Sequence, residues 1–379
     1  MPESQIPVVV TGMAALTAFG RGTEPVCDAV FAGRTAFGAV TRFDVTGRRA
    51  RSAATLEDPA DLATELARVA EEACRSAGLD SSLRARCPVL LAAHADPALV
   101  RSPDPARAAA GAAGGAAALA SRCGLGPAIR AYTTGCVAAS TALIDGALMI
   151  RSGRAERVLI VAGYLVDADY FIAFDVGRAL SPAGAVRSFS RDRDGMLLGD
   201  AVAAVLLESA EAAERRGAPR LAMVAGWGRA GDGYHVCQPR PDGAGLARAI
   251  EAALSRAGLP AERIGYVNAH GTGTVQSDAA EILGLRQALG GHVRRVPVSS
   301  TKSAHGHALE ASALLELIIT ILALRRGRLP VNAGSRDRDP DCELNLVLEP
   351  AGVEAEYALS VNAAFGGANT ALVVQAGRD

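Results

Sequence analysis

The sequence predicts an α/β fold built from two halves of similar size. Short β-branched runs alternate with apolar helical segments, this alternation occurs twice, and each round contains one strongly apolar helix that follows a glycine-flanked reactive residue. Strands that alternate with buried helices are typical of a sheet covered by helices on both faces. We expect the halves to be residues 1–210 and 211–379, with the first turns of the two apolar helices meeting at one site.

The first half contains four predicted strands and three helical segments. Valine, leucine and isoleucine dominate four short runs, which we predict as strands at 7–12, 87–93, 157–163 and 201–208. Leucine and valine recur on one face of 59–77, which predicts an amphipathic helix. An apolar helix is predicted at 138–150, and the alanine- and glycine-rich segment 102–122 predicts a loop that leads into a helix.

The second half repeats this pattern with different residues. We predict its strands at 221–227, 264–268, 357–363 and 371–375. One helix is predicted at 245–257 and a strongly apolar one at 311–325.

The bulk composition favours a folded, soluble protein. Of the 379 residues, half are hydrophobic and 21% are charged, and the formal net charge of −1 offers no general attraction for nucleic acid or an acidic membrane. No apolar run reaches the length of about 18 residues that a membrane span needs, and the first residues do not resemble a secretory signal. The seven cysteines form no CxxC pair, so we expect a cytoplasmic protein with mostly buried thiols.

Cys136 is the candidate nucleophile of the first half. It stands in TTGCVAAS, directly before the apolar helix, and its neighbours are small. A thiol at the start of a helix meets unpaired N–H groups and the positive end of the helix dipole. We therefore expect a lowered thiol pKa and a reactive thiolate.

Two histidines and a lysine are the candidates of the second half. His270 follows a predicted strand in NAHGTGT, and His307 precedes the second apolar helix in KSAHGH. Lys302 is the only lysine of the chain, and Glu316 is an isolated carboxylate within an apolar run. A buried carboxylate needs a partner, so we predict that Lys302 and Glu316 pair and fix the loop that holds His307.

Other chemistries lack their motifs in this sequence. His305 and His307 are two residues apart without HExxH or CxxC beside them, so we predict no metal site. The phosphate loop GxxxxGK[ST] and the hydrolase motif GxSxG do not occur.

Four motifs together resemble one family. They are TTGCVAAS, NAHGTGT followed by Asp278 and Glu281, KSAHGH with Glu316, and NAAFGGAN at 362–369. In their order and spacing they resemble the β-ketoacyl synthases, most closely the elongating enzymes that condense substrates on a carrier protein. The resemblance covers essentially the whole chain.

The resemblance implies a thiolase-like fold of five layers, α-β-α-β-α, made of two pseudo-repeated halves. It implies that Cys136 accepts an acyl group, and that His270 and His307 promote decarboxylation of a malonyl carrier and condensation. Thr272 and Thr274 match positions that bind the phosphopantetheine arm, and Phe365 matches a gating residue. The implied partners are an acyl carrier protein and a second subunit, either a copy of this chain or a chain-length factor, and no resident cofactor is implied.

The chain also departs from the family. It is short before Cys136, Glu310 stands where glycine is usual, and His305 replaces a usual threonine. These departures favour a specialised polyketide or polyene pathway over housekeeping fatty acid synthesis. The arginines at 187, 191 and 193 offer a basic surface for an acidic carrier.

Two other functions stay open at this point. A non-catalytic subunit of the chain-length-factor type lacks the active cysteine. A thiolase uses a second cysteine, whereas Cys342 lies outside any reactive motif, and a starter-type condensing enzyme has asparagine where this chain has His307.

Overall fold

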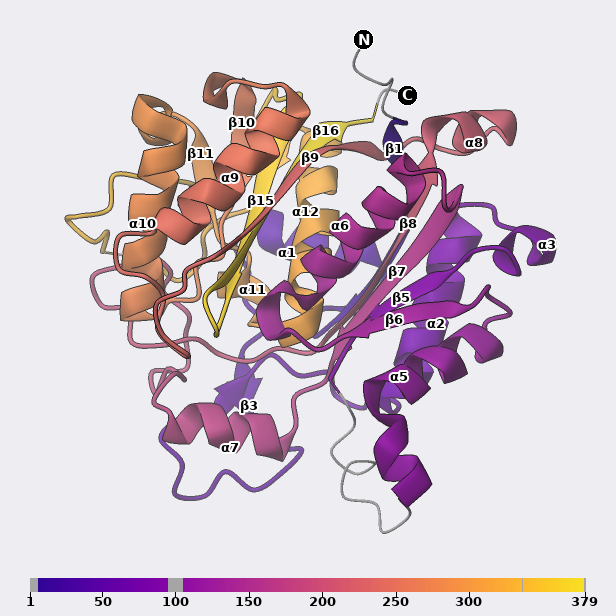
Figure 1. Cartoon of the computed structure of the whole chain (residues 1–379). Helices are drawn as coiled ribbons and strands as arrows, with labels where there is room; N and C mark the ends of the chain where they lie inside the picture. Colours follow the sequence, from indigo (N-terminus) through magenta and orange to yellow (C-terminus); the bar gives the residue numbers. More distant parts are fainter. Residues whose placement is uncertain (1–5, 95–104, 336, 378–379) are drawn as a thin grey trace.

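The computed structural model describes residues 6–94, 105–335 and 337–377 (Figure 1). Within these residues, twelve strands form one sheet that contains two arrays of five. The first array runs β1 (Val8–Thr17), β8 (Ala201–Ser209), β7 (Arg157–Tyr164), β5 (Val89–Ala92) and β6 (Ala128–Tyr132). The second runs β9 (Ala222–Gly231), β16 (Ala368–Ala376), β15 (Tyr357–Ala364), β10 (Ile264–Asn268) and β11 (Pro297–Ser299).

The two arrays have the same strand directions. In each, the first two pairings are antiparallel and the next two are parallel. β1 and β9 join the arrays through two residue pairs. The outer strands β13 (Asn345–Leu346) and β2 (Gly20–Arg21) complete the sheet. The chain therefore builds the same five-stranded unit twice, although the division expected at residues 210 and 211 remains a prediction.

Helices form three layers around the two arrays. α2 (Leu62–Ser76) and α5 (Pro105–Arg122) pack on the first array, and α9 (Ala244–Ala257) packs on the second, with α10 (Val275–Leu289) beside it. α6 (Ala138–Arg151) and α12 (Ser312–Arg326) pack against each other and against strands of both arrays. This arrangement agrees with the expected five layers.

Shorter elements connect these layers. The helices are α1 (Thr23–Phe31), α3 (Ser81–Arg84), α7 (Ala168–Val176), α8 (Ala210–Arg215) and α11 (Lys302–His305). The 3-10 turns are η1 (Gly135–Val137), η2 (Ala261–Arg263), η3 (Gly290–Arg294) and η4 (Leu309–Ala311). The two-residue strands are β3 (Gly38–Ala39), β4 (Ser52–Ala53), β12 (Arg328–Leu329) and β14 (Ala351–Gly352).

The strands are continuous apolar runs in the sequence because both of their faces are buried in the core. Alternate residues of β8 point to opposite faces: Ala203, Val205 and Leu207 join the central core, whereas Val202, Ala204 and Leu206 join the core under α2. α12 is buried on all sides from Ser312 to Leu324. The two central helices are thus held rigidly, and their first turns can carry precisely placed side chains.

The predicted elements agree with the structure to within five residues at either end, but six of the described helices were not predicted. These are α1, α3, α7, α8, α10 and α11, and the strands β6 and β11 were not predicted either. In the segment 102–122, the helix starts at Pro105 and bends at Gly111, and residues 102–104 lie outside the described residues. Across the part of the chain that the structure describes, no helix is both long and apolar enough to cross a membrane.

Candidate active site

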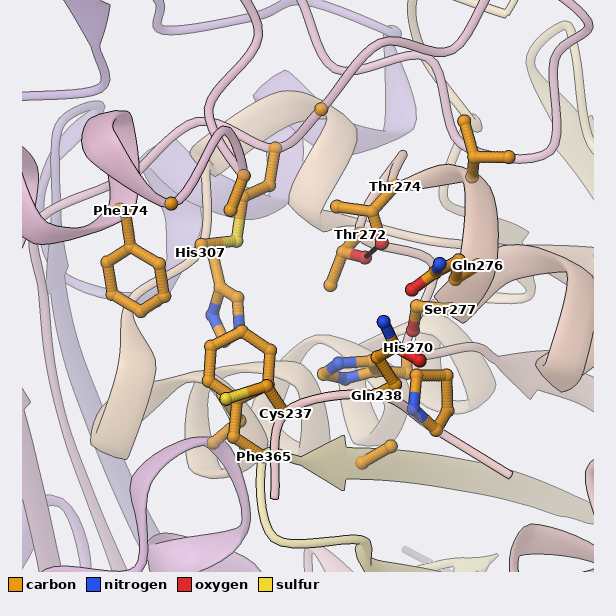
Figure 2. Close-up of a pocket in the computed structure, with 18 of the residues that line it drawn as sticks. Phe174, Cys237, Gln238, His270, Thr272, Thr274, Gln276, Ser277, His307 and Phe365 are labelled. Carbon is orange, nitrogen blue, oxygen red and sulfur yellow. Dashed lines mark hydrogen bonds between the residues drawn. The ribbon is translucent and has the colours of Figure 1, made fainter. Parts of the chain in front are cut away.

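A pocket of about 500 Å³ opens between the two halves (Figure 2). Six of the candidate residues line it, one from the first half and five from the second: Cys136, His270, Thr272, Thr274, His307 and Phe365. Lys302 and Glu316 are not among its lining residues. The structure therefore brings the candidate nucleophile and both histidines to one cavity, whereas Lys302 and Glu316 do not line it.

Cys136 lies in the turn η1, directly before α6. Gly135 has a φ of 59°, a left-handed conformation that glycine adopts easily, and it aims the following cysteine at the pocket. The expected lowering of the thiol pKa is wrong. Burial raises the pKa of the Cys136 thiol to about 12, because loss of hydration opposes the thiolate more strongly than the nearby Lys302 favours it.

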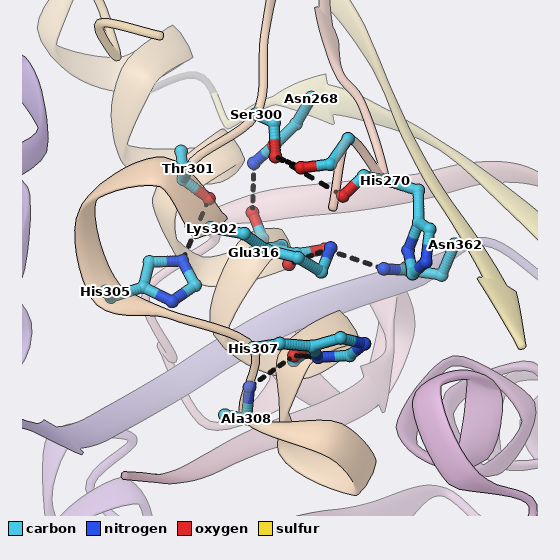
Figure 3. A network of polar contacts seen from close by, with 12 residues as sticks. Asn268, His270, Ser300, Thr301, Lys302, His305, His307, Ala308, Glu316 and Asn362 are labelled. Carbon is cyan, nitrogen blue, oxygen red and sulfur yellow. Dashed lines mark hydrogen bonds and ion pairs between the residues drawn. The ribbon is translucent and has the colours of Figure 1, made fainter. Parts of the chain in front are cut away.

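His307 is held in one orientation by its own loop (Figure 3). Its Nδ1 lies 2.9 Å from Ser312 Oγ and accepts the Leu309 N–H at 3.2 Å. The main-chain N–H of His307 donates to the Leu197 carbonyl at 2.7 Å. Since Nδ1 is an acceptor, we infer that the proton of the neutral ring is on Nε2. Leu309 has a φ of 40°, and such strain is often found where a functional group is positioned.

His270 is held through its backbone. The buried Glu281 carboxylate on α10 accepts the N–H of His270 at 2.6 Å and that of Gly271 at 2.7 Å. Ser300 Oγ donates to the Gly271 carbonyl at 2.7 Å. Burial raises the pKa of Glu281 to about 8. These contacts secure the turn after β10, while the imidazole Nδ1 of His270 makes no hydrogen bond within the described structure.

The two imidazoles face each other almost perpendicularly. Their ring centroids are 5.6 Å apart and their planes meet at 83°. Burial, and then the positive charge of Lys302, hold the pKa of both rings well below the usual value for histidine. Both rings are therefore neutral at pH 7. Neutral imidazoles can offer N–H donors to an oxygen that gains negative charge.

Lys302 and Glu316 form the expected ion pair. The ammonium nitrogen lies 2.5 Å from Glu316 Oε1, and both side chains are almost completely buried. Asn362 Nδ2 donates to the other carboxylate oxygen at 2.6 Å. This pair ties α11 to α12 and to β15 (Figure 3). The pair thus fixes the segment between α11 and α12, in which His307 lies.

The mouth of the pocket carries the remaining candidates. The hydroxyls of Thr272 and Thr274 are 2.9 Å apart, and both side chains line the cavity. Phe365 is 59% exposed in the turn between β15 and β16, and its ring centroid lies 5.9 Å from that of Phe174. Gly366 follows with a φ of 83°. An exposed ring beside a glycine can move without disturbing a packed core.

Sequence reasoning missed several residues of this site. Ser312, which binds the His307 ring, is a small polar residue at the start of an apolar helix. Only its position five residues after His307 could have indicated this contact from the sequence. Phe174 and Met196 also line the pocket. They come from loops and a helix that no pattern in the sequence connects to Cys136.

Fold and site together define a class of protein. A cysteine before one central helix and two neutral histidines in the other half are groups that can carry out acyl transfer through a thioester. Family models match both halves: the "Beta-ketoacyl synthase, N-terminal domain" at residues 61–213 and the "Beta-ketoacyl synthase, C-terminal domain" at residues 221–336.

Individual relatives agree with these matches. The alpha subunit of the tetracenomycin polyketide synthase ketoacyl synthase from Streptomyces glaucescens is 33% identical, over 97% of this chain and 96% of the relative. A 3-oxoacyl-[acyl-carrier-protein] synthase 2 of Vibrio cholerae is 38% identical over 64% of this chain and 61% of its own length.

Solved structures are similar over the whole chain. The ishigamide ketosynthase/chain length factor matches with a TM-score of 0.89 and 27% identity, covering 99% of this chain and all of the other. A β-ketoacyl synthase from Burkholderia phymatum matches with a TM-score of 0.91 and 28% identity, covering 98% of this chain and all of the other. The chain belongs to the β-ketoacyl synthase family and is an acyltransferase.

Proposed function

We propose that this enzyme extends an acyl chain by two carbons through decarboxylative condensation with a malonyl group on an acyl carrier protein. One observation carries the proposal: Cys136, His270 and His307 line the same pocket. Thr272 and Thr274 line it as well and offer hydroxyls to the phosphopantetheine arm.

The first step is acyl transfer to Cys136. The Cys136 sulfur attacks the carbonyl of the acyl thioester on the carrier, its proton passes to the leaving thiol, and an acyl-cysteine forms. The main-chain N–H groups of Cys136 and Phe365 receive the carbonyl oxygen as it gains charge. Because burial opposes the free thiolate, the proton leaves the sulfur as the new bond forms.

The second step forms the carbon–carbon bond. The malonyl thioester loses CO₂, and the electron pair of the broken bond becomes an enolate. His307 Nε2–H and His270 donate hydrogen bonds to the enolate oxygen, as neutral rings can. The enolate carbon attacks the acyl-cysteine carbonyl, the Cys136 thiolate leaves and takes up a proton, and a 3-oxoacyl carrier is released.

Lys302 and Glu316 act through position and charge. Neither lines the pocket, so we assign them no contact with substrate. The buried pair fixes the loop of His307, and the ammonium adds to burial in holding the pKa of both histidines low.

The partners follow from the same proposal. Two structural neighbours are a ketosynthase/chain length factor and a ketosynthase in complex with its acyl-carrier protein. We propose that a carrier protein donates the substrates and that the enzyme serves a specialised polyketide pathway. We also propose a second subunit, either another copy of this chain or a chain-length factor, which binds at the edge strand β6, where Ile129 is 49% exposed. Arg193 cannot contribute to a basic docking surface, because its side chain is buried against Asp339.

The test is acylation of the protein, followed by intact-protein mass spectrometry. The protein is incubated with carrier proteins that bear acyl chains of different lengths. The proposal predicts an adduct of the mass of the acyl group, absent from Cys136→Ala. An adduct that persists in Cys136→Ala contradicts the proposed nucleophile, and a chain-length-factor role predicts no adduct with any donor.

A further inference from the structure

A cluster of four buried or half-buried side chains adjoins Cys136 and has no role in the steps above. Glu310, in the turn η4, is 3% exposed, and its Oε2 lies 3.3 Å from His94 Nδ1. The rings of Tyr164 and Tyr170 flank the imidazole, with centroids 5.5 Å and 4.6 Å away. These four residues, Glu310, His94, Tyr164 and Tyr170, are called the His94 cluster below.

The His94 cluster packs beside an apolar wall of the pocket. This wall lines the cavity together with Cys136 and consists of Phe174, Ala179 and Met196. The wall and Cys136 pack in one apolar core cluster with both tyrosines of the His94 cluster. The turn η4, which carries Glu310, packs directly against the turn η1, which carries Cys136. Within the described residues, no member of the His94 cluster lines the cavity, so the cluster lies outside it and against its apolar wall.

An acyl chain on Cys136 is expected to lie along this apolar wall. Another part of the cavity carries the hydroxyls of Thr272 and Thr274, which the proposed function assigns to the phosphopantetheine arm. A hydrocarbon chain gains free energy when it leaves water for an apolar surface, and the wall offers such a surface. The length of chain that fits therefore depends on the residues packed against the wall.

The His94 cluster gives this side of the cavity a closed and polar boundary. Glu310 stands where glycine is usual in the family, so its carboxylate and the imidazole of His94 occupy space that a glycine would leave free. A buried carboxylate needs a hydrogen-bond partner, and a hydrocarbon chain cannot replace His94 in that role. A long acyl chain would therefore have to displace a buried polar pair, which is unfavourable.

We propose that His94 and Glu310 are specificity-determining residues that together limit the length of the acyl chain on Cys136. The inference rests on the proposed role of Cys136 as the acylated nucleophile. It requires no charge on the imidazole, because a neutral ring can donate its Nδ1–H to the carboxylate. The two residues act by filling space, and they contact no reacting atom in this scheme.

The experiment measures the rate at which thioesters of N-acetylcysteamine acylate Cys136, with acyl chains that run from acetyl to dodecanoyl. The Cys136 sulfur attacks the thioester carbonyl, N-acetylcysteamine leaves as the thiol, and the proton of Cys136 passes to it. Trypsin releases residues 131–151, in which Cys136 is the only cysteine, so peptide mass spectrometry follows this thiol apart from the exposed Cys237. No carrier protein or condensation is required, so failure of this inference can be distinguished from failure of the proposed elongation.

The parent protein should accept short chains, and its acylation rate should fall by about tenfold or more for chains beyond its limit. The variant His94→Ala/Glu310→Ala removes both side chains and should recover most of this rate for the long chains. The variant His94→Gln/Glu310→Gln removes the carboxylate charge but leaves the space filled, so it should keep the limit of the parent. His292→Ala is the matched control: its imidazole lies in η3, 2.8 Å from the Ile264 carbonyl, and its removal should leave the limit unchanged.

Three results would overturn the inference. Equal acylation of the parent by all chains would show that no limit exists, and this result needs no variant. An unchanged limit in the double alanine variant would assign the limit to other residues; if that variant does not fold, Glu310→Ala alone must extend the limit. An equal extension in the alanine and glutamine variants would assign the limit to charge rather than to filled space. If no thioester acylates Cys136 in the parent, the proposed nucleophile is contradicted and this inference is contradicted with it.

Discussion

Replacement of Lys302 by methionine should strongly destabilise the fold, because it leaves a buried carboxylate without its cation. Glu316 is fully buried, and Lys302, 2.5 Å away, is the cation paired with it. Asn362 stays as a neutral donor at 2.6 Å. Removal of one member of a buried ion pair typically costs about 3–5 kcal/mol of unfolding free energy. We expect a loss in this range.

The charge, rather than the shape, is responsible for this expected loss. The double variant Lys302→Met/Glu316→Gln removes both charges and should recover most of the stability. Glu211→Gln is the matched control: Glu211 is 82% exposed, forms an ion pair with Arg215 at 2.8 Å, and should show no measurable change because water and salt screen this pair.

Guanidinium unfolding followed by the fluorescence of Trp227 measures these differences. Trp227 is the only tryptophan and is 4% exposed in the central core, so its emission reports loss of that core. A loss below about 1 kcal/mol in Lys302→Met would refute the reasoning that rests on the cost of an unpaired buried charge. A double variant as unstable as the single one would refute it as well.

Three further predictions concern the loop and the mouth of the pocket. Ser312→Ala removes the hydroxyl at Nδ1 of His307. The rate of condensation should fall by about tenfold, which corresponds to the loss of about one hydrogen bond, while acylation of Cys136 is retained. Equal slowing of both steps would contradict this prediction. Burial lowers the pKa of His305 to about 3. The unfolded chain therefore binds a proton below pH 6.5 that the folded protein does not bind, and the free energy of unfolding decreases as the pH falls. Between pH 6.5 and 5, His305→Gln should gain about 2 kcal/mol of unfolding free energy relative to the parent in denaturant unfolding, and a pH-independent difference would contradict this. Phe365→Ala removes an exposed ring, so the unfolding midpoint should stay unchanged while the range of accepted acyl chains, measured by competition, widens; an unaltered range would exclude a gating role.

The sequence predicted the features that are encoded locally. The small residues around Cys136 and the apolar run after it predicted the turn and the central helix α6, and the isolated Glu316 predicted its pairing with Lys302. In the first case the neighbouring residues restrict the backbone conformation. In the second, a buried carboxylate requires a cation, and Lys302 can supply it.

Features that depend on distant contacts could not be predicted in this way. α10 was missed because its buried positions include glycine and alanine, which leave a weak apolar pattern. The thiol pKa of Cys136 was misjudged because helix position is visible in the sequence, whereas burial is not. His94 and Glu310 are 216 residues apart, and only the fold brings them into contact.

The central claim is that Cys136 carries the chain while His307 serves the condensation, and a single-turnover experiment tests it most directly. Protein acylated on Cys136 is mixed with malonyl carrier protein, and mass spectrometry follows both proteins over time. The account predicts that the adduct disappears as a 3-oxoacyl carrier two carbons longer appears, and that His307→Gln keeps its adduct without forming this product. Normal elongation by Cys136→Ala, or release of the adduct as a free acid without extension, would contradict the account.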